Sequence, residues 1–533
     1  MKPYPAGARW FRHCFHHRWN VCVLFALALF PVAFASTAPA ATLRFEVGVA
    51  PGLISTPATG RLFVILARKN EPEPRVALGD NGPDAPFVVA RDVNELAPGA
   101  TAILDTNAIT FPAANLSEVP SGDYFVQTLL ESNRDLLLPD APGNLYSGVK
   151  KVHLDAARGG VVKLELGHRI PDEQSPADTE LVKFVKIQSR LLSQFHGRPI
   201  YLRAGIILPR DHGREPGRKY PLWVRIGGYG ERCTSAAALM EPDANFRRNW
   251  MADGAPRMIY LFLDGAGPHG DPYQVNSANN GPYGDAVTQE LIPYVEEKFR
   301  AIGEPRARVL SGVSTGGWVS LALQVFYPDF FNGTWTSCPD PVDFRAFELV
   351  NIYSDENAYV NEYGAERPSV RSANGDVRLT MRREVRMENV LGHGDSWTGS
   401  GAQWGAWSAT FGPRGPDGRP AVLWDPETGK INHAVADKWK QYDLCLYMQA
   451  HWKTLGPKLQ GKLHICVGDA DNFFLNNAVH LLDEFLSKAD PPYKGRIVYG
   501  PGKEHGWSDV SMPKKMKEME AAIAGTSEDT KSK

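Results

Sequence analysis

The sequence contains a Gly-x-Ser-x-Gly motif at residues 312–316, with Ser314 at its centre. A serine hydroxyl is a weak nucleophile, so it needs a base within hydrogen-bond reach and a backbone that exposes its oxygen. The two glycines allow the sharp strand-to-helix turn that exposes it, because larger side chains would crowd that turn. An apolar run precedes the motif, and apolar residues at helical spacing follow it as far as Tyr327. The pattern predicts a nucleophile elbow, with Ser314 attacking an acyl carbon.

A nucleophilic serine needs a general base, and the best-placed histidine is His505. It lies in a glycine-containing loop at residues 502–507, directly after the last expected strand at residues 496–499. A loop histidine after the final strand is the usual position of the base in a fold that carries such an elbow. His393 and His433, which lie between the elbow and the last strands, remain alternatives.

Two acids, Asp469 and Asp471, follow the expected strand at residues 463–467. The third member of a catalytic triad orients the imidazole and stabilises its charged form. We expect Asp471 to do this, because the turn that begins at Gly468 places it clear of the strand end. Asp469 remains an alternative. Either acid could also form an Asx turn or cap the helix expected from Asn476.

The negative charge that develops on the attacked carbonyl needs backbone N–H donors, which form an oxyanion hole. One candidate is the N–H of Thr315, directly after the serine and at the start of a helix. The other is the N–H of Tyr229, in the Gly-Gly-Tyr-Gly sequence at residues 227–230. Glycines permit close approach of the backbone to a substrate, although a plain tight turn would also explain them.

From residue 179 to residue 525 the sequence alternates strand-length apolar runs with helical patterns. Such alternation predicts an α/β domain with a mostly parallel sheet that helices cover on both faces. Strands are expected at residues 182–187, 200–208, 222–226, 258–263, 308–311, 463–467 and 496–499, and helices at residues 285–299 and 476–487.

The alternation fails between about residues 340 and 438, which show no clear periodicity. An insertion after the strand that follows the elbow would lie over the carboxyl ends of the strands, where sites form in open α/β sheets. It is either a lid or substrate wall, or a loop-rich subdomain packed on its own aromatic residues. Its tryptophans are Trp397, Trp404, Trp407 and Trp424.

Residues 42–178 contain short alternating runs separated by Pro, Gly, Asn and Asp. This pattern predicts an N-terminal β-sandwich domain, followed by a linker at residues 168–178. The domain could serve as a packing or spacer element, or it could bind a polymer or the far end of a substrate. The runs lie at residues 43–47, 61–66, 124–129 and 160–166.

Residues 1–40 have the pattern of a secretory signal peptide. Basic residues precede an apolar run at residues 21–34, and small residues suited to a signal peptidase follow. We therefore expect an exported protein, periplasmic or extracellular, with no stable membrane span after cleavage. An uncleaved anchor is the alternative, but the run is short for a span and contains Pro31. Residues 526–533 are expected to form a disordered tail.

The charge and the cysteines exclude some classes of partner and site. The formal net charge of −2 argues against a nucleic-acid partner. No zinc-type spacing of Cys and His occurs, so no metal site is expected. An exported chain permits one or two disulfides, although buried free thiols are equally plausible. The cysteines beyond the signal are Cys233, Cys338, Cys445 and Cys466.

These motifs resemble the putative-esterase, or esterase D-like, group of α/β-hydrolases. That group includes feruloyl and acetylxylan esterases, enterochelin esterase and mycolyltransferases. The resemblance runs from about residue 182 to residue 519 and excludes the N-terminal domain and the insertion. It rests on residues 200–209, 220–230, 279–285 and 291–296, on the elbow with residues 327–331, and on the loop of His505.

Carried over to this sequence, the resemblance implies that Ser314 is the nucleophile, His505 the base and Asp471 the acid. The chain departs from the family in one place. A His-Gly pair often follows the oxyanion strand, and this chain has Gly227-Gly228 instead. The backbone donor is kept, but any role of that histidine is lost.

Together these observations predict a secreted serine hydrolase that cleaves carboxylic esters through an acyl-enzyme and needs no metal or organic cofactor. The substrate would be a small-molecule or carbohydrate-linked ester. The tryptophan-rich insertion favours an aromatic or sugar group, because flat rings and sugars stack on aromatic faces. A serine peptidase or an acyltransferase on the same fold is an alternative. A non-catalytic binding protein on a hydrolase fold is another, because fold does not fix function.

Overall fold

The computed structural model describes residues 42–525. The signal peptide expected at residues 1–40 and the tail expected at residues 526–533 lie outside the described residues. In the described part of the chain, no helix is long and apolar enough to cross a membrane.

The largest element is an eight-stranded sheet with the strand order β11-β12-β14-β13-β17-β18-β21-β22. The six strands from β14 to β22 run parallel, whereas β11 and β12 pair antiparallel at one end. The mostly parallel sheet predicted from the sequence is therefore confirmed. Its strands are β11 (Val182–Ser189), β12 (Ile200–Ile207), β13 (Leu222–Ile226), β14 (Ile259–Leu263), β17 (Arg308–Val313), β18 (Thr334–Ser337), β21 (Leu463–Gly468) and β22 (Arg496–Gly500).

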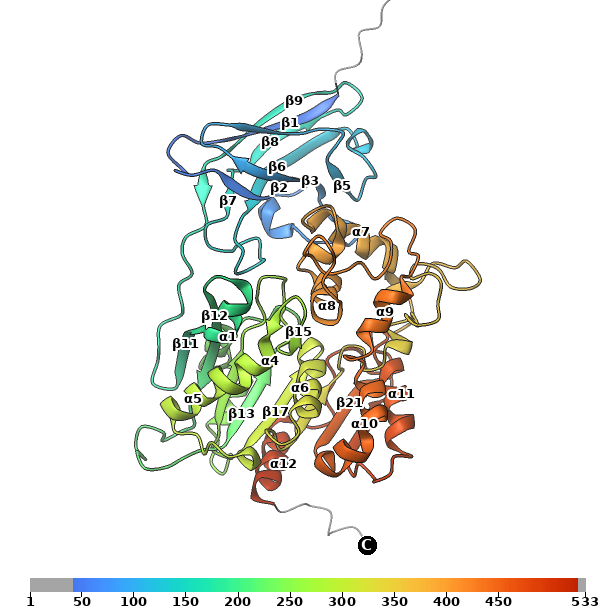
Figure 1. Cartoon of the computed structure of the whole chain (residues 1–533). Helices are drawn as coiled ribbons and strands as arrows, with labels where there is room; N and C mark the ends of the chain where they lie inside the picture. Colours follow the sequence, from blue (N-terminus) through green and yellow to red (C-terminus); the bar gives the residue numbers. More distant parts are fainter. Residues whose placement is uncertain (1–41, 526–533) are drawn as a thin grey trace, which may run out of the picture. The chain divides into compact units, whose positions relative to one another are not determined.

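Helices cover both faces of this sheet (Figure 1). Successive side chains of a strand point to opposite faces, so Leu222 and Val224 of β13 enter one core and Trp223 enters the other. The first core includes α1 (Arg190–His196), α5 (Ile292–Phe299), α6 (Thr315–Phe326), α10 (Leu444–Leu459) and α11 (Asn476–Leu486). The second includes α2 (Ser235–Leu239), α3 (Asn245–Trp250) and α12 (Met512–Ala524).

The single helix expected at residues 285–299 is divided in the structure. It begins as α4 (Tyr283–Ala286), continues through a π-helical turn (Val287–Leu291) and ends as α5. Pro293 lies in the first turn of α5. Because proline has no N–H, it cannot donate to the preceding turn, and the hydrogen-bond spacing changes just before it.

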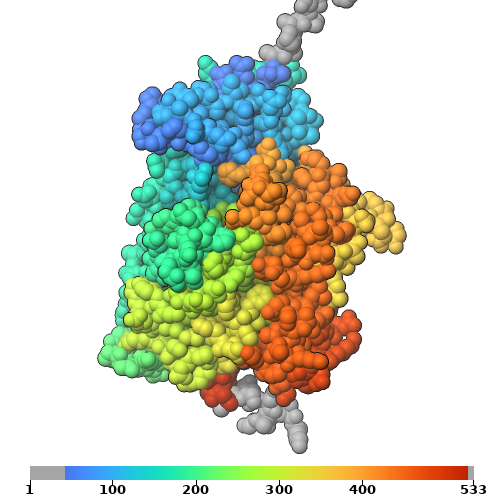
Figure 2. Space-filling model, in the orientation of Figure 1, coloured from blue at the N-terminus to red at the C-terminus, as the bar shows by residue number. Residues whose placement is uncertain are grey.

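The insertion has more regular structure than the sequence pattern indicated. It contains a β19–β20 hairpin (Pro368–Arg371 and Val377–Thr380), α7 (Met381–Leu391), α8 (Gln403–Phe411) and α9 (His433–Trp439). Eight of the nine residues of α8 are buried, so the helix has no polar stripe and its sequence shows no amphipathic period. In Figure 2 the residues of the insertion, coloured yellow to orange, form a continuous part of the visible surface.

The tryptophans of the insertion form its interior. Trp397 stacks on Trp424 with ring centroids 5.0 Å apart, and Trp404 meets Trp407 edge to face at 4.7 Å. Each of the four is at most 2% exposed. The subdomain is therefore packed on its own aromatic residues. These four rings offer no exposed face on which a flat ligand could stack.

Residues 42–169 form two β-sheets, with strand orders β4-β1-β9 and β10-β7-β6-β2-β3-β5, and β8 pairs with β6. Phe45, Val64, Tyr124 and Leu164 belong to one apolar core that both sheets share. The β-sandwich domain stays a prediction. The strands are β1 (Leu43–Val49), β2 (Ala58–Ala67), β3 (Phe87–Leu96), β4 (Thr101–Leu104), β5 (Ile109–Phe111), β6 (Gly122–Glu131), β7 (Leu145–Tyr146), β8 (Lys150–Leu154), β9 (Gly160–Leu166) and β10 (His168–Arg169).

Strand β2 also contacts the insertion. Phe63 and Ile65 pack against Met387 and Val390 of α7. Arg61 is fully buried on the same strand, where it donates to the carbonyl oxygen of Val390 at 2.8 Å and forms ion pairs with Asp92 and Asp395 at 2.8 and 2.9 Å. A buried cation is costly unless it is paired, and every terminal nitrogen of Arg61 has a partner here.

The cysteines Cys233, Cys338, Cys445 and Cys466 are all buried free thiols. The sequence allowed either disulfides or free thiols at these four positions, and the structure contains free thiols.

Candidate active site

Ser314 stands between β17 and α6, with φ 59° and ψ −127°. Positive φ is rare for a residue that has a Cβ, and it is maintained here by the close packing of the turn. A Cβ on Gly312 would collide with the carbonyl oxygen of Gly316, and one on Gly316 would collide with the carbonyl oxygens of Ile226 and Gly227. Both glycines of the motif are thus required by close backbone approach. The strand, sharp turn and helix match the elbow predicted from the sequence.

The loop that follows β13 lies beside this turn, because Gly316 is packed on the backbone of Ile226 and Gly227. Within that loop, the N–H of Gly228 donates to Glu231 and the N–H of Gly230 donates to Asp271. Among residues 42–525, the intervening N–H of Tyr229 has no hydrogen-bond partner, and neither has the N–H of Thr315. Unpaired N–H groups at a helix start and in an adjacent loop are available to an oxyanion.

His505 and Asp471 form a hydrogen bond between Nδ1 and Oδ2 of 2.8 Å. Asp471 is fully buried, and its other oxygen accepts from the N–H of Phe473 at 2.9 Å. The N–H of His505 donates to the Asn472 side chain at 3.0 Å. Because the Asp471 carboxylate accepts a hydrogen bond from Nδ1, the neutral imidazole carries its proton on Nδ1. Its Nε2 is then free to act as a base.

The pKa of His505 is shifted by opposing influences. Burial by itself would lower the pKa, because it disfavours the charged ring. The hydrogen bond and the negative charge of Asp471, together with the charge of Asp340, outweigh burial and raise the pKa above its ordinary value. The site therefore favours an imidazolium, the species that a general base becomes when it takes a proton.

Ser314 and His505 belong to the same edge of the sheet, at the carboxyl ends of parallel strands. The N–H of Ser314 donates to the carbonyl oxygen of Ser337 at the end of β18. The next residue, Cys338, has its sulfur within 4.8 Å of a His505 nitrogen and an Asp471 oxygen. Among the described residues, the Ser314 hydroxyl makes no hydrogen bond. In ligand-free sites such contacts are often long and shorten when substrate binds.

The alternative acids and histidines of the sequence lie elsewhere. The Asp469 carboxylate accepts from the N–H of Gly502 at 2.6 Å, and among the described residues it forms no hydrogen bond or ion pair with the His505 ring. His393 lies 3.4 Å from Asp92, next to the N-terminal sheets. His433 is the first residue of α9. Of the candidate acids and histidines, the structure brings together Asp471 and His505.

Asp340 is a site residue that the sequence patterns did not reveal. Its N–H donates to the carbonyl oxygen of Ser314 at 3.3 Å. Its Oδ2 accepts from the Tyr273 hydroxyl at 2.5 Å and the Thr315 hydroxyl at 2.9 Å. Gln403 and Trp407 of α8 donate to the same oxygen, both at 3.1 Å. A buried carboxylate oxygen that accepts from several donors fixes its neighbours, so Asp340 links the insertion to the start of α6.

The sequence signal for Asp340 was an acid placed just after the strand that follows the elbow, within Pro339-Asp340-Pro341. Its location matched that of Asp471 after β21. The sequence does not reveal the four donors to Asp340, because they come from segments up to 67 residues away.

Cys338, Asp471 and His505 offer three potential metal-ligand atoms. Their chemistry does not fit a metal ion well. Asp471 and His505 use the relevant atoms on each other, and burial raises the pKa of the Cys338 thiol to about 12. A metal would need the thiolate. The absence of a metal cofactor stays a prediction.

A family model described as Putative esterase matches residues 201–502, which is more than half of the chain. The chain belongs to the Putative esterase family. This confirms the resemblance seen in the sequence, and with it a carboxylic ester hydrolase on an α/β-hydrolase fold. No curated protein matches the chain.

Solved structures with similarity to the chain include other esterases and serine hydrolases. A ferulic acid esterase is 15% identical, over 61% of this chain and 92% of its own, with a TM-score of 0.36. The fluorophosphonate-binding serine hydrolase FphF of Staphylococcus aureus is 13% identical, over 63% and 97%, with a TM-score of 0.38. The ferulic acid esterase AmCE1/Fae1A of Anaeromyces mucronatus is 13% identical, over 66% and 94%, with a TM-score of 0.32.

Proposed function

We propose that this member of the Putative esterase family is an exported serine esterase that works through an acyl-enzyme. The observation that carries the proposal is the arrangement at the carboxyl edge of the sheet. A serine held at positive φ lies beside two backbone N–H groups that have no partner in the described part of the chain, and the hydrogen-bonded pair of Asp471 and His505 follows the last two strands. These are the parts that serine acyl transfer needs.

In the first half-reaction, the Ser314 hydroxyl attacks the ester carbonyl while Nε2 of His505 takes its proton. Asp471 holds the ring and stabilises the imidazolium that forms. The carbonyl oxygen becomes an oxyanion, which accepts hydrogen bonds from the N–H groups of Tyr229 and Thr315. His505 then gives the proton to the departing alkoxide, so that the alcohol leaves and the acyl group stays on Ser314.

In the second half-reaction, water takes the place of the alcohol. His505 removes a proton from the water as it attacks the acyl-enzyme, and the same two N–H groups stabilise the second oxyanion. The proton returns to the Ser314 oxygen when the carbon–oxygen bond breaks. The carboxylic acid is released and the serine is restored. No step needs a metal or an organic cofactor.

The buried tryptophans bear on the substrate. The sequence favoured an aromatic or sugar-linked ester because four tryptophans could provide stacking faces, and these rings form the interior of the insertion instead. That reason for an aromatic acyl group is therefore withdrawn. A small-molecule or carbohydrate-linked ester remains the proposed substrate class, and the Gln403 side chain is a polar group next to Thr315.

The decisive experiment compares the full chain with Ser314→Ala. Hydrolysis of p-nitrophenyl acetate and butyrate is measured together with labelling by a fluorophosphonate and intact mass. We expect turnover and a single adduct on the wild type, and loss of turnover by at least about a thousandfold with no adduct on the variant. Ser487→Ala, an exposed serine near the end of α11, is the matched control and should behave as wild type.

A folded wild-type protein that neither turns over nor labels would refute the proposal and favour a binding protein on this fold. Addition of an alcohol acceptor tests the acyltransferase alternative. Water should remain the main acceptor of the acyl group, and predominant formation of a new ester would overturn the hydrolytic assignment.

A further inference from the structure

One cavity in the described part of the chain is a hollow of about 440 Å³ that is lined by none of the proposed catalytic residues. Three parts of the chain contribute to it. The N-terminal sheets supply the ends of β2, β3 and β6, the α/β domain supplies the segments after α1 and β14, and the insertion supplies residues near 393 and 419. A volume of this size suits a small organic ligand.

Glu131 is the most unusual residue of the lining. It is only 5% exposed, and among residues 42–525 its carboxylate forms no hydrogen bond or ion pair. Burial raises its pKa to about 7, against the opposing charges of His393 and Arg61. An unpaired buried carboxyl group is costly unless something binds it, and the cavity is the space that it adjoins.

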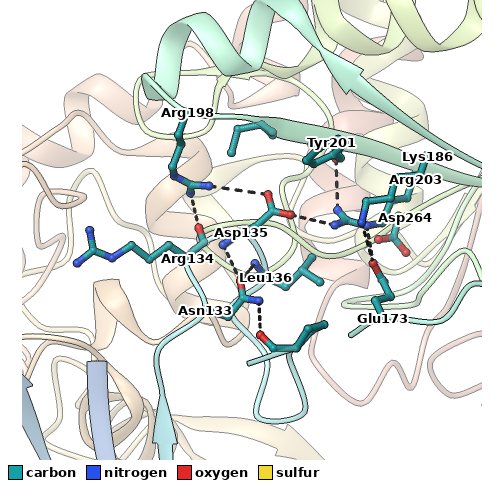
Figure 3. A network of polar contacts seen from close by, with 12 residues as sticks. Asn133, Arg134, Asp135, Leu136, Glu173, Lys186, Arg198, Tyr201, Arg203 and Asp264 are labelled. Carbon is teal, nitrogen blue, oxygen red and sulfur yellow. Dashed lines mark hydrogen bonds and ion pairs between the residues drawn. The ribbon is translucent and has the colours of Figure 1, made fainter. Parts of the chain in front are cut away.

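Arg134, an exposed residue, provides a cation at the same cavity that has no side-chain partner among residues 42–525. The loop that bears it is tightly held (Figure 3). Asn133 accepts from the N–H groups of Asp135 and Leu136 at 2.8 and 2.9 Å, and Arg198 donates to the Arg134 carbonyl oxygen. The Arg134 guanidinium itself extends away from this network and has no partner among the described residues. Its backbone is therefore fixed while its donors remain free.

The other cations of the lining are already engaged. Arg198 lies 3.9 Å from Asp135, and Arg419 forms an ion pair with Asp417 at 2.8 Å. His269 has no hydrogen-bond partner among the described residues, and burial together with nearby cations lowers its pKa to about 4. His269 is thus neutral near pH 7 and offers a hydrogen bond instead of a charge.

The lining contains no Phe, Tyr or Trp, so it offers no platform for an aromatic ring. Asparagine, serine and threonine residues also line the cavity. A planar guanidinium with free donors matches a carboxylate, and an unpaired carboxyl accepts hydrogen bonds from hydroxyls. A phosphate dianion fits less well, because Glu131 and Asp92 lie in the same lining.

We propose that this cavity binds a uronic acid, a sugar whose carboxylate pairs with Arg134 and whose hydroxyls donate to Glu131. The site is separate from the proposed catalytic residues, and its occupancy does not rest on the proposed function. It would place an acidic sugar unit against the N-terminal sheets and the insertion at once. An N-terminal domain with this site would bind carbohydrate as well as act as a spacer.

Calorimetric titration of the full chain with D-glucuronate, D-glucose and inorganic phosphate tests this proposal. We expect glucuronate to bind, and glucose and phosphate to bind at least about tenfold more weakly. Arg134→Gln should weaken glucuronate binding by about tenfold or more, and Glu131→Gln by about threefold. Arg158→Gln removes an 88% exposed arginine from the turn between β8 and β9, outside the cavity lining, and should leave binding unchanged.

Failure of glucuronate to bind at about 10 mM, in a protein whose melting shows it to be folded, would overturn the proposal. Equal binding of glucose, tighter binding of phosphate, or unchanged affinity in Arg134→Gln would also overturn it. Ser314→Ala should bind glucuronate as the wild type does. A loss of affinity in that variant would place the ligand at the serine instead, so the result stands apart from the test of esterase activity.

Discussion

The proposed catalytic site and the polar cavity differ in whether their charged side chains have protein partners. At the catalytic site the carboxylates of Asp471 and Asp340 accept hydrogen bonds from protein groups alone. At the cavity, Glu131 and Arg134 have no partner among the described residues. A reacting group must be held in one orientation before substrate arrives, whereas a group that binds a ligand needs hydrogen-bonding atoms that no protein group already occupies.

The largest effect of a substitution is expected on kcat, at the proposed catalytic acid. Asp471→Asn keeps the size of the side chain but cannot stabilise the imidazolium, so kcat should fall by about 10³–10⁴-fold. Esterase assays across substrate concentration measure this loss. Asp469→Asn is the matched control. Its carboxylate accepts a hydrogen bond from Gly502 and, in the described part of the chain, none from His505, so kcat should fall less than about threefold. Equal losses in the two variants would reject Asp471 as the orienting acid.

The next effect concerns Asp340 and the dependence of activity on pH. His505 must be neutral to act as a base, and its pKa is raised, so wild-type activity should fall with decreasing pH at a midpoint above 6.5. Asp340→Asn removes a charge that raises this pKa. The midpoint should move to lower pH, and kcat should fall by about tenfold because the Thr315 contact is weakened. A midpoint that stays in place would mean that Asp340 acts through packing alone.

The smallest effect is expected on the free energy of unfolding, when a paired arginine and an arginine without a protein partner in the described residues are each replaced in the N-terminal part of the chain. Arg61→Met removes a buried cation whose acids are partly exposed, so the free energy of unfolding should decrease by about 2 kcal/mol. Arg134→Met removes no protein partner, and the change should stay within about 0.5 kcal/mol. Urea titration of both variants measures the difference. Similar decreases in the free energy of unfolding would show that Arg134 stabilises the fold. Arg134 would then not differ from Arg61 in the way proposed here.

The insertion shows where sequence patterns stop being informative. The buried face of α7 includes the polar residues Glu388 and Asn389, and α8 is buried almost throughout, so the usual helical period is absent where the helix is most enclosed. A cluster of tryptophans on a loop-rich segment reads equally well as a stacking surface or as a core. Only their burial, at most 2% exposed, decides for the core.

The sequence by itself determined the local features of this protein. Seven strands of the central sheet, the elbow at Ser314 and the loops that hold Asp471 and His505 all follow from short patterns, because apolar periodicity and glycine positions act over a few residues. The family followed from the same segments. Within these limits the candidate nucleophile, base and acid follow from residue types and spacing alone.

Only the tertiary structure decided which side chains meet. It placed Asp471 in hydrogen-bond contact with the His505 ring, although the two residues are 34 positions apart in the sequence. It also assembled the donors around Asp340, and it brought segments of the α/β domain and of the insertion to the cavity that Glu131 and Arg134 line. These contacts depend on how layers pack, and packing distributes its energy over many non-local contacts that no short window of sequence contains.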